Sequence, residues 1–404
     1  MVLLKPPALA LSTVLAPTLA LGLLVAPTEA DAAGLPTSVK AKLGLEFDYP
    51  VHKEFQLANI FGFPEYENLT VPVYKSHGTH GPGILLVHGN SSSSRSYARQ
   101  VFGALGNYYE IYLIDLPGFG NAGEVDPGRP FPTDALGVPV GFPEYQLGWV
   151  EAVALAAADP EIDPAIVAGW SLGGDIALIT QGLGLLPNVE GLFIFGTSPS
   201  GANPPTTEAP FLAPDVPGLP GLAVLASFGF GFQFNPASPL GFDLFGDFLD
   251  PVPPYAAPPI SDAPTIGDAY MAAFFDDDQR AWGYIPPFFQ EDGFDRADPR
   301  TRSSLGALVL TLPPNPALDE LAIMQGLAGD PADPDDDVAL AVLVGEEDAF
   351  VNVQYLHDLA DAGYLPTLWG GEVIEVEGAG HAIHWDRPLA FSWYLHAFTS
   401  SVAG

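Results

Sequence analysis

The chain of 404 residues contains no cysteine, and it has only 13 lysines and arginines against 49 aspartates and glutamates. Without cysteine, disulfides, thiolate nucleophiles and cysteine-based metal sites are excluded. The formal net charge of −36 repels phosphate backbones and anionic headgroups, which argues against nucleic-acid binding and electrostatic membrane docking. The hydrophobic content of 48% and the length suffice for one large domain or two ordinary ones.

The N-terminus has the pattern of an export signal. Lys5 gives a positive start, and the run 6–28 that follows is rich in Ala and Leu and carries no charge. Ala30-Asp31-Ala32 then supplies an A-x-A cleavage site. An uncleaved anchor helix is the alternative, because the run is long enough to span a bilayer, although Pro17 interrupts it. We therefore predict a signal peptide over residues 1–33, export to the periplasm or the medium, and no stable membrane insertion after cleavage.

The remainder predicts one α/β domain that is interrupted by an insertion. Residues 34–200 alternate short apolar runs with helical stretches, which is typical of a mainly parallel sheet flanked by helices. Residues 201–335 hold 22 of the 43 prolines and 13 of the 26 phenylalanines, so we expect an inserted lid or cap there. Residues 336–404 return to the α/β pattern. The expected strands are 83–88, 110–115, 165–168, 192–195, 338–344 and 372–376, and the expected helices are 145–158, 351–362 and 388–400.

A nucleophile motif follows the strand 165–168. Gly169-Trp170-Ser171-Leu172-Gly173 has the form G-x-S-x-G and precedes a helical stretch. In such an elbow the serine sits on a strained turn, and side chains larger than hydrogen at Gly169 and Gly173 would collide with the strand and the helix. The motif in this context predicts Ser171 as a nucleophile.

A serine hydroxyl needs a histidine to accept its proton. His381 lies in a loop directly after the strand 372–376, where this mechanism places the base, whereas His384 three residues later is the competing base. We expect His384 to lie at a helix start beside the site.

The third group is a carboxylate that orients the imidazole. Asp348 follows the strand 338–344, and its neighbour Glu347 is the alternative, because the geometry at a strand end cannot be read to one residue. The resulting chain order is serine, acid, histidine, which differs from the orders in chymotrypsin and subtilisin.

The tetrahedral intermediate requires two backbone N–H donors. Leu172, directly after the nucleophile, would provide one. The loop after the strand 83–88 would provide the other through the amide of Asn90, while His88 is expected to be a structural residue beneath that loop.

The sequence resembles the α/β-hydrolase superfamily in five successive blocks that occur in the family's order. These blocks are LLVHGNSSSSRSY, YLIDLPGFGNA, AGWSLGGDIAL, LVGEEDAFV and EGAGHAIHWDRP. The resemblance implies an α/β-hydrolase fold, a triad of Ser171, Asp348 and His381, an oxyanion hole from Asn90 and Leu172, and no cofactor or metal. Haloalkane dehalogenases and epoxide hydrolases of this fold use an aspartate nucleophile, so a serine at position 171 argues against both.

The sequence therefore predicts an exported serine hydrolase of small-molecule esters that acts through an acyl-enzyme. The scarcity of basic residues near the motifs favours neutral esters with an apolar acyl or alcohol part. The same triad could instead cleave an amide, a lactone or a carbon–carbon bond, and a non-catalytic exported binding protein on the same fold is the alternative from another class.

Overall fold

The computed structural model describes residues 49–130, 132, 141–201, 204–206, 208, 271–282, 285–298, 300, 301, 304, 319–329 and 337–404. The predicted signal peptide, residues 1–33, lies outside the described residues, as does most of the insertion, 201–335. Among the helices that the structure describes, none is long and apolar enough to cross a bilayer.

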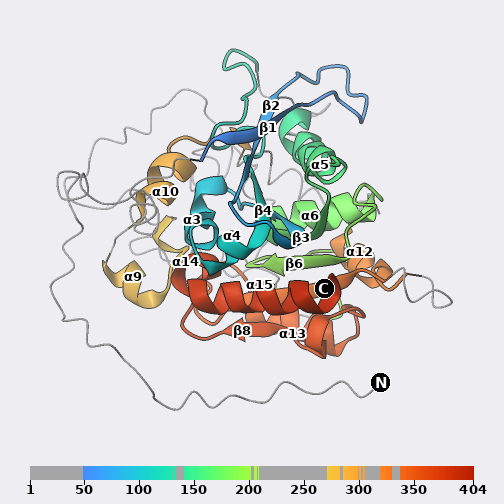
Figure 1. Cartoon of the computed structure of the whole chain (residues 1–404), viewed down its shortest axis with the longest axis vertical. Coiled ribbons are helices and arrows are strands. Elements are labelled where there is room, and N and C mark those ends of the chain that lie inside the picture. The colour runs from blue at the N-terminus through green and yellow to red at the C-terminus, as the bar shows by residue number, and fades with distance from the viewer. Residues whose placement is uncertain are drawn as a thin grey trace, which may run out of the picture.

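Eight strands form one twisted sheet in the order β1-β2-β4-β3-β5-β6-β7-β8 (Figure 1). The pairs β1–β2 and β2–β4 are antiparallel, and every pair from β4–β3 to β7–β8 is parallel. The strands are β1 (Val51–Gln56), β2 (Thr70–Lys75), β3 (His80–Val87), β4 (Tyr109–Ile114), β5 (Pro164–Trp170), β6 (Gly191–Phe195), β7 (Ala339–Gly345) and β8 (Ile374–Val376).

Helices cover both faces of this sheet (Figure 1). The described helical elements are η1 (Ser94–Tyr97), α3 (Ala98–Val101), α4 (Ala104–Tyr108), α5 (Pro143–Ala157), α6 (Leu172–Gly182), α9 (Asp277–Trp282), α10 (Pro287–Phe289), η4 (Gln290–Phe294), α12 (Glu320–Gly326), α13 (Val353–Asp361), η7 (Trp369–Gly371), α14 (Ile383–Asp386) and α15 (Pro388–Val402). The packing of helices on both sides explains why the central strands contain long apolar runs.

Two hydrophobic cores form because successive side chains of a strand point to opposite faces. On β3, Leu85 and Val87 pack with α5, α6, α12 and α13, whereas Ile84 and Leu86 pack with α3, α4, α14 and α15. All four side chains are fully buried. The sheet is thus the middle layer of three, with helices packed on both of its faces.

The strands that the sequence predicts are present as β3 to β8, with ends that differ by a few residues. The antiparallel pair β1–β2 at the sheet edge was not predicted. In β1 the side chains are exposed or half-buried throughout, since the strand has a neighbour on one side only. Its sequence, VHKEFQ, therefore lacks the apolar run by which a buried strand is recognised.

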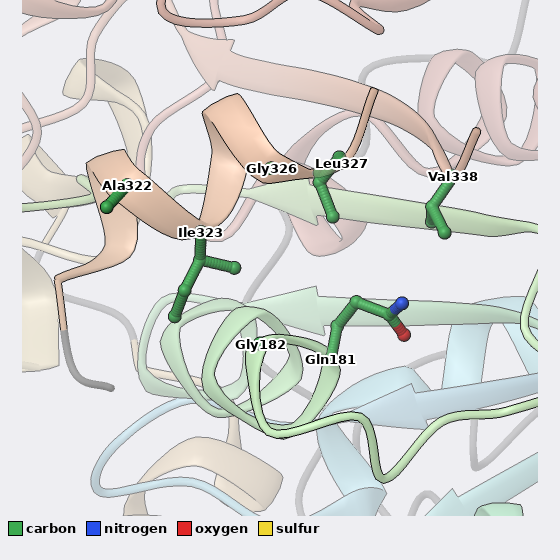
Figure 2. A pocket seen from close by; sticks show the side chains of 7 residues that line it. All are labelled: Gln181, Gly182, Ala322, Ile323, Gly326, Leu327 and Val338. Carbon is green, nitrogen blue, oxygen red and sulfur yellow. The ribbon is translucent and has the colours of Figure 1, made fainter. Parts of the chain in front are cut away.

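The helix that follows the nucleophile motif packs closely on α12. A Cβ atom added at Gly182, the last residue of α6, would lie 2.5 Å from Cγ1 of Ile323. The glycine therefore allows the two helices to approach each other. A pocket opens beside this contact, and in Figure 2 the Ile323 side chain points from α12 towards α6. The residues that line it are Gln181, Gly182, Ala322, Ile323, Gly326, Leu327 and Val338.

Candidate active site

Ser171 occupies the turn between β5 and α6 in a strained backbone conformation. Its φ is 51° and its ψ is −122°, a region that residues other than glycine rarely adopt. The turn is held by a hydrogen bond from the Ser171 N–H to the carbonyl of Phe195 on the neighbouring strand, at 3.0 Å. The side chain is thereby presented at the carboxyl edge of the sheet.

The two glycines of the motif are required by backbone contacts. A Cβ atom at Gly169 would lie 2.3 Å from the carbonyl oxygen of Gly173, and one at Gly173 would lie 2.2 Å from the carbonyl oxygen of Val87. Backbone atoms cannot move aside as a side chain can. Strand, turn and helix therefore pack together only with glycine at both positions, as the motif predicted.

His381 and Asp348 meet in the loops that follow β8 and β7. The Nδ1 atom of His381 lies 2.9 Å from Oδ2 and 3.1 Å from Oδ1 of Asp348, and both side chains are buried. Oδ1 also accepts hydrogen bonds from the N–H groups of Phe350, at 2.8 Å, and Val351, at 3.0 Å. A proton on Nδ1, facing the carboxylate, would leave Nε2 able to accept one.

The loop of His381 is fixed against the turn of Ser171. The indole Nε1 of Trp170 donates to the carbonyl of His381 at 2.9 Å. A Cβ atom at Gly196, directly after β6, would come within 3.2 Å of Nδ1 of His381. The rings of Phe350 and Phe274 lie 4.9 Å and 5.5 Å from the imidazole between ring centroids. These contacts bring the loop of His381 to the residue directly before Ser171.

The expected oxyanion donors lie on either side of the serine. Leu172 is the first residue of α6, where backbone N–H groups have no partner within the helix. Asn90 lies in the buried loop after β3, and this loop approaches the serine so closely that a Cβ atom at Gly89 would lie 3.1 Å from Cβ of Ser171. The two amides therefore belong to segments that flank Ser171.

His88 has the structural role that the sequence predicted. Its Nδ1 bonds to the carbonyl of Gly89 at 2.8 Å, and its Nε2 accepts from the N–H of Leu116 at 3.1 Å. Burial lowers the pKa of His88, so the ring stays neutral and can serve as donor on one side and acceptor on the other.

The two alternative residues point elsewhere. The Glu347 carboxylate accepts a hydrogen bond from the N–H of Asp277 at 2.6 Å, which directs it to the start of α9. His384 lies on the short helix α14, fully buried, with its ring 4.7 Å from that of Trp170 and 4.8 Å from that of Tyr97. Burial lowers the pKa of His384 well below its usual value. Neither ring nitrogen has a hydrogen-bond partner among the described residues.

A pair of buried carboxyl groups behind the serine was not predicted. Asp175, four residues after Ser171 on α6, contacts Glu320 at the start of α12. Burial raises the pKa of both side chains, that of Glu320 to about 7, and the Ser200 N–H donates to Glu320 at 2.7 Å. The two residues are distant in the sequence, and a pattern within either segment alone gives no sign of their contact.

The pocket of Figure 2 is separate from this site. Gln181 and Gly182 lie at the end of α6 that is opposite Ser171. A rise of 1.5 Å per residue places them about 15 Å from the serine along the helix. Within the described part of the chain, no cluster of three metal-ligating side chains is present.

Comparison with known proteins shows a family match over most of the chain. Residues 84–392 match the model of a family described as "Alpha/beta hydrolase family". Pimeloyl-[acyl-carrier protein] methyl ester esterases of Xylella fastidiosa (strain M12) and Xanthomonas oryzae pv. oryzae (strain MAFF 311018) are 34% and 35% identical to the chain over 120 residues. Each match covers 30% of this chain and 38% of the relative.

Solved structures share the fold. The N-acyl homoserine lactonase AidH, in its complex with N-butanoyl homoserine, superposes with a TM-score of 0.54 at 21% identity, covering 86% of this chain and 96% of the lactonase. A thermophilic esterase from Thermogutta terrifontis superposes with a TM-score of 0.52 at 14% identity, covering 87% of this chain and 100% of the esterase. At such identities the likeness concerns the fold.

Proposed function

The chain belongs to the alpha/beta hydrolase family, and from this membership we propose that it is a serine hydrolase that cleaves neutral carboxylic esters through an acyl-enzyme. The observation that carries the proposal is the buried contact between His381 and Asp348 beside the strained turn of Ser171. An imidazole that presents Nδ1 to a buried carboxylate can take a proton at Nε2, and beside a serine on such a turn this is the arrangement that activates a hydroxyl for attack.

In the proposed mechanism, Ser171 attacks the ester carbonyl while Nε2 of His381 takes the hydroxyl proton. The backbone amides of Leu172 and Asn90 stabilise the negative charge on the carbonyl oxygen. His381 then gives the proton to the departing alcohol, which leaves the acyl group on Ser171. A water molecule activated by the same histidine releases the acid. Asp348 stays ionised and stabilises the imidazolium in both steps.

Two observations favour an ester with apolar parts as the substrate. The curated relatives that match in sequence are named as esterases. In addition, the rings of Trp170, Phe274 and Phe350 lie next to the imidazole, so the surroundings of the base are aromatic. Such a site accepts apolar acyl or alcohol groups more readily than charged ones.

A fluorophosphonate probe tests the proposed nucleophile. We expect the probe to label the chain once, and peptide mapping to locate the label on Ser171. A panel of matched p-nitrophenyl esters, anilides and lactones then ranks the reaction types by kcat/KM. Labelling at another serine, or no labelling together with no turnover, would contradict the proposal and favour a binding protein on this fold. Preferred turnover of lactones or anilides would keep the nucleophile and change the substrate class.

We also propose export, on the charge-free run 6–28 and the Ala30-Asp31-Ala32 sequence. N-terminal sequencing of the protein from culture fractions is expected to give a mature chain that begins near Ala33. A membrane-bound product that retains Lys5 would instead indicate an uncleaved anchor.

A further inference from the structure

The loop that carries His381 is held by a carboxylate that the proposed mechanism does not use. Asp386, the last residue of α14, accepts a hydrogen bond at Oδ2 from the N–H of Gly380 at 2.9 Å. Gly380 directly precedes His381. The bond therefore closes a short loop of the chain, from Gly380 to Asp386, that contains the histidine. The backbone of the histidine is thereby fixed relative to α14.

A piece of the segment between β6 and β7 contacts the same loop, and it also lies against the carboxylate of Asp386 through Asp276. We call residues 274–277 the bridging segment. The carbonyl of Phe274 accepts a hydrogen bond from the N–H of Ala382 at 2.6 Å. A Cβ atom at Gly380 would lie 2.4 Å from the backbone of Phe275, so the two backbones are in direct contact. Both chain neighbours of His381 are therefore packed against or bonded to the insertion.

The bridging segment also reaches the loop of the acid. The N–H of Asp277 donates to the carboxylate of Glu347, the residue before Asp348, at 2.6 Å. The residue before it, Asp276, forms an ion pair with Arg387, which directly follows α14, at 3.0 Å. The loops after β7 and β8 are thus linked through the insertion, in addition to the direct bond from the Glu347 N–H to the loop of His381.

We propose that Asp386 and the bridging segment are positioning elements that set the His381 ring against Asp348 and Ser171. This inference rests on the proposed function, because it assigns the contacts to a triad. The described residues 274–277 then contribute to the positioning of the base. A displacement of about 1 Å in a catalytic group can lower a rate by about 100-fold, so the loss of one such bond should be measurable.

Asp386→Ala removes the acceptor of the Gly380 bond, whereas Asp386→Asn retains an oxygen at the same place. We expect Asp386→Ala to lower kcat by about 10- to 100-fold with KM changed by less than about 3-fold, because binding does not depend on the ring of His381. Asp386→Asn should restore most of kcat. Assays at about pH 8 keep the wild-type carboxyl ionised, since burial raises the pKa of Asp386 to about 7.

Matched variants separate positioning from general stability. Asp361→Ala removes an exposed carboxylate from α13 and serves as the control for loss of charge. If Asp386→Ala does not fold, the pair Glu347→Ala and Glu347→Gln tests the same bridging segment at a half-buried side chain. Only Glu347→Ala should lower kcat, because glutamine still accepts from the N–H of Asp277. Equal kcat for alanine and amide variants at either position, whether high or low, overturns the proposal.

Hydrogen exchange at the Gly380 amide reads the contact without turnover. We expect faster exchange in Asp386→Ala, and wild-type exchange in Asp386→Asn and Asp361→Ala. Unchanged exchange in Asp386→Ala overturns the assignment whatever the activity. If the exchange responds but the wild-type chain shows neither ester turnover nor labelling at Ser171, the proposed function fails, and with it the positioning role in catalysis, while the hydrogen bond itself stands.

Discussion

His381→Ala is expected to lower kcat for ester hydrolysis by on the order of 10³-fold or more. The imidazole is the group that removes the proton of Ser171 and later protonates the leaving alcohol, so its loss affects both steps. Ser171→Ala should cost a similar amount. Because the two residues act as one unit, the double variant should be no slower than either single one. Steady-state kinetics with a p-nitrophenyl ester give all three values.

His384→Phe is the matched control for this experiment. His384 is enclosed by the rings of Trp170, Tyr97 and Phe195, so a phenyl ring replaces the imidazole among similar neighbours. We expect kcat to stay within a few-fold of the wild type, because the buried ring makes no hydrogen bond among the described residues. Full activity in His381→Ala together with inactivity in His384→Phe would transfer the role of base to His384.

Glu320→Gln is expected to make the protein more stable at alkaline pH. Glu320 and Asp175 are buried against each other, and burial raises the pKa of Glu320 from 4.5 to about 7. A carboxyl group whose pKa is raised by folding is disfavoured as an anion in the folded chain. The stability that the protonated Glu320 side chain contributes is therefore fully present below about pH 4.5 and is lost as the pH rises through 7, on the order of 3 kcal/mol for this one group.

Denaturant unfolding at about pH 5 and about pH 8 measures this effect. Glutamine can still accept from the N–H of Ser200 and can donate to Asp175, but it cannot ionise. We expect the wild type to lose stability between the two pH values and the variant to lose clearly less. Glu372→Gln, at an exposed position, is the control and should follow the wild type. An identical slope in Glu320→Gln and the wild type would show that this carboxyl does not titrate in that range.

The sequence predicted the buried part of the fold because burial leaves a local signature. Strands β3 to β7 each contain a run of buried apolar residues, since helices cover both of their faces. The edge strand β1 lacks this signature, and its partner β2 was missed with it. Much of the insertion lies outside the described residues, so the predicted lid stays a prediction.

The sequence predicted a site residue where the spacing of a motif is enough to identify it, as in the elbow around Ser171. Spacing could not choose between Asp348 and Glu347, because both follow the same strand. In the structure one turns to His381 and the other to α9, a choice made by backbone N–H groups of the loop and of the insertion. The contacts of Asp386 with Gly380 and of Asp175 with Glu320 depend on tertiary packing, and sequence periodicity carries no information about them. The catalytic roles of all these residues remain proposals.

The long segment between β6 and β7 also has a consequence for folding. These two strands pair in parallel, Gly191 with Ala339 and Phe195 with Leu343, across the whole intervening chain. The entropy of closing such a loop rises only slowly, by about 0.6 kcal/mol for each doubling of its length, so the insertion can change in length at little cost to the sheet. Pairing at long sequence separation is nevertheless slow. The proposed acid and base follow β7 and β8, so a chain still being made would carry its serine without either partner until these two strands have joined the sheet.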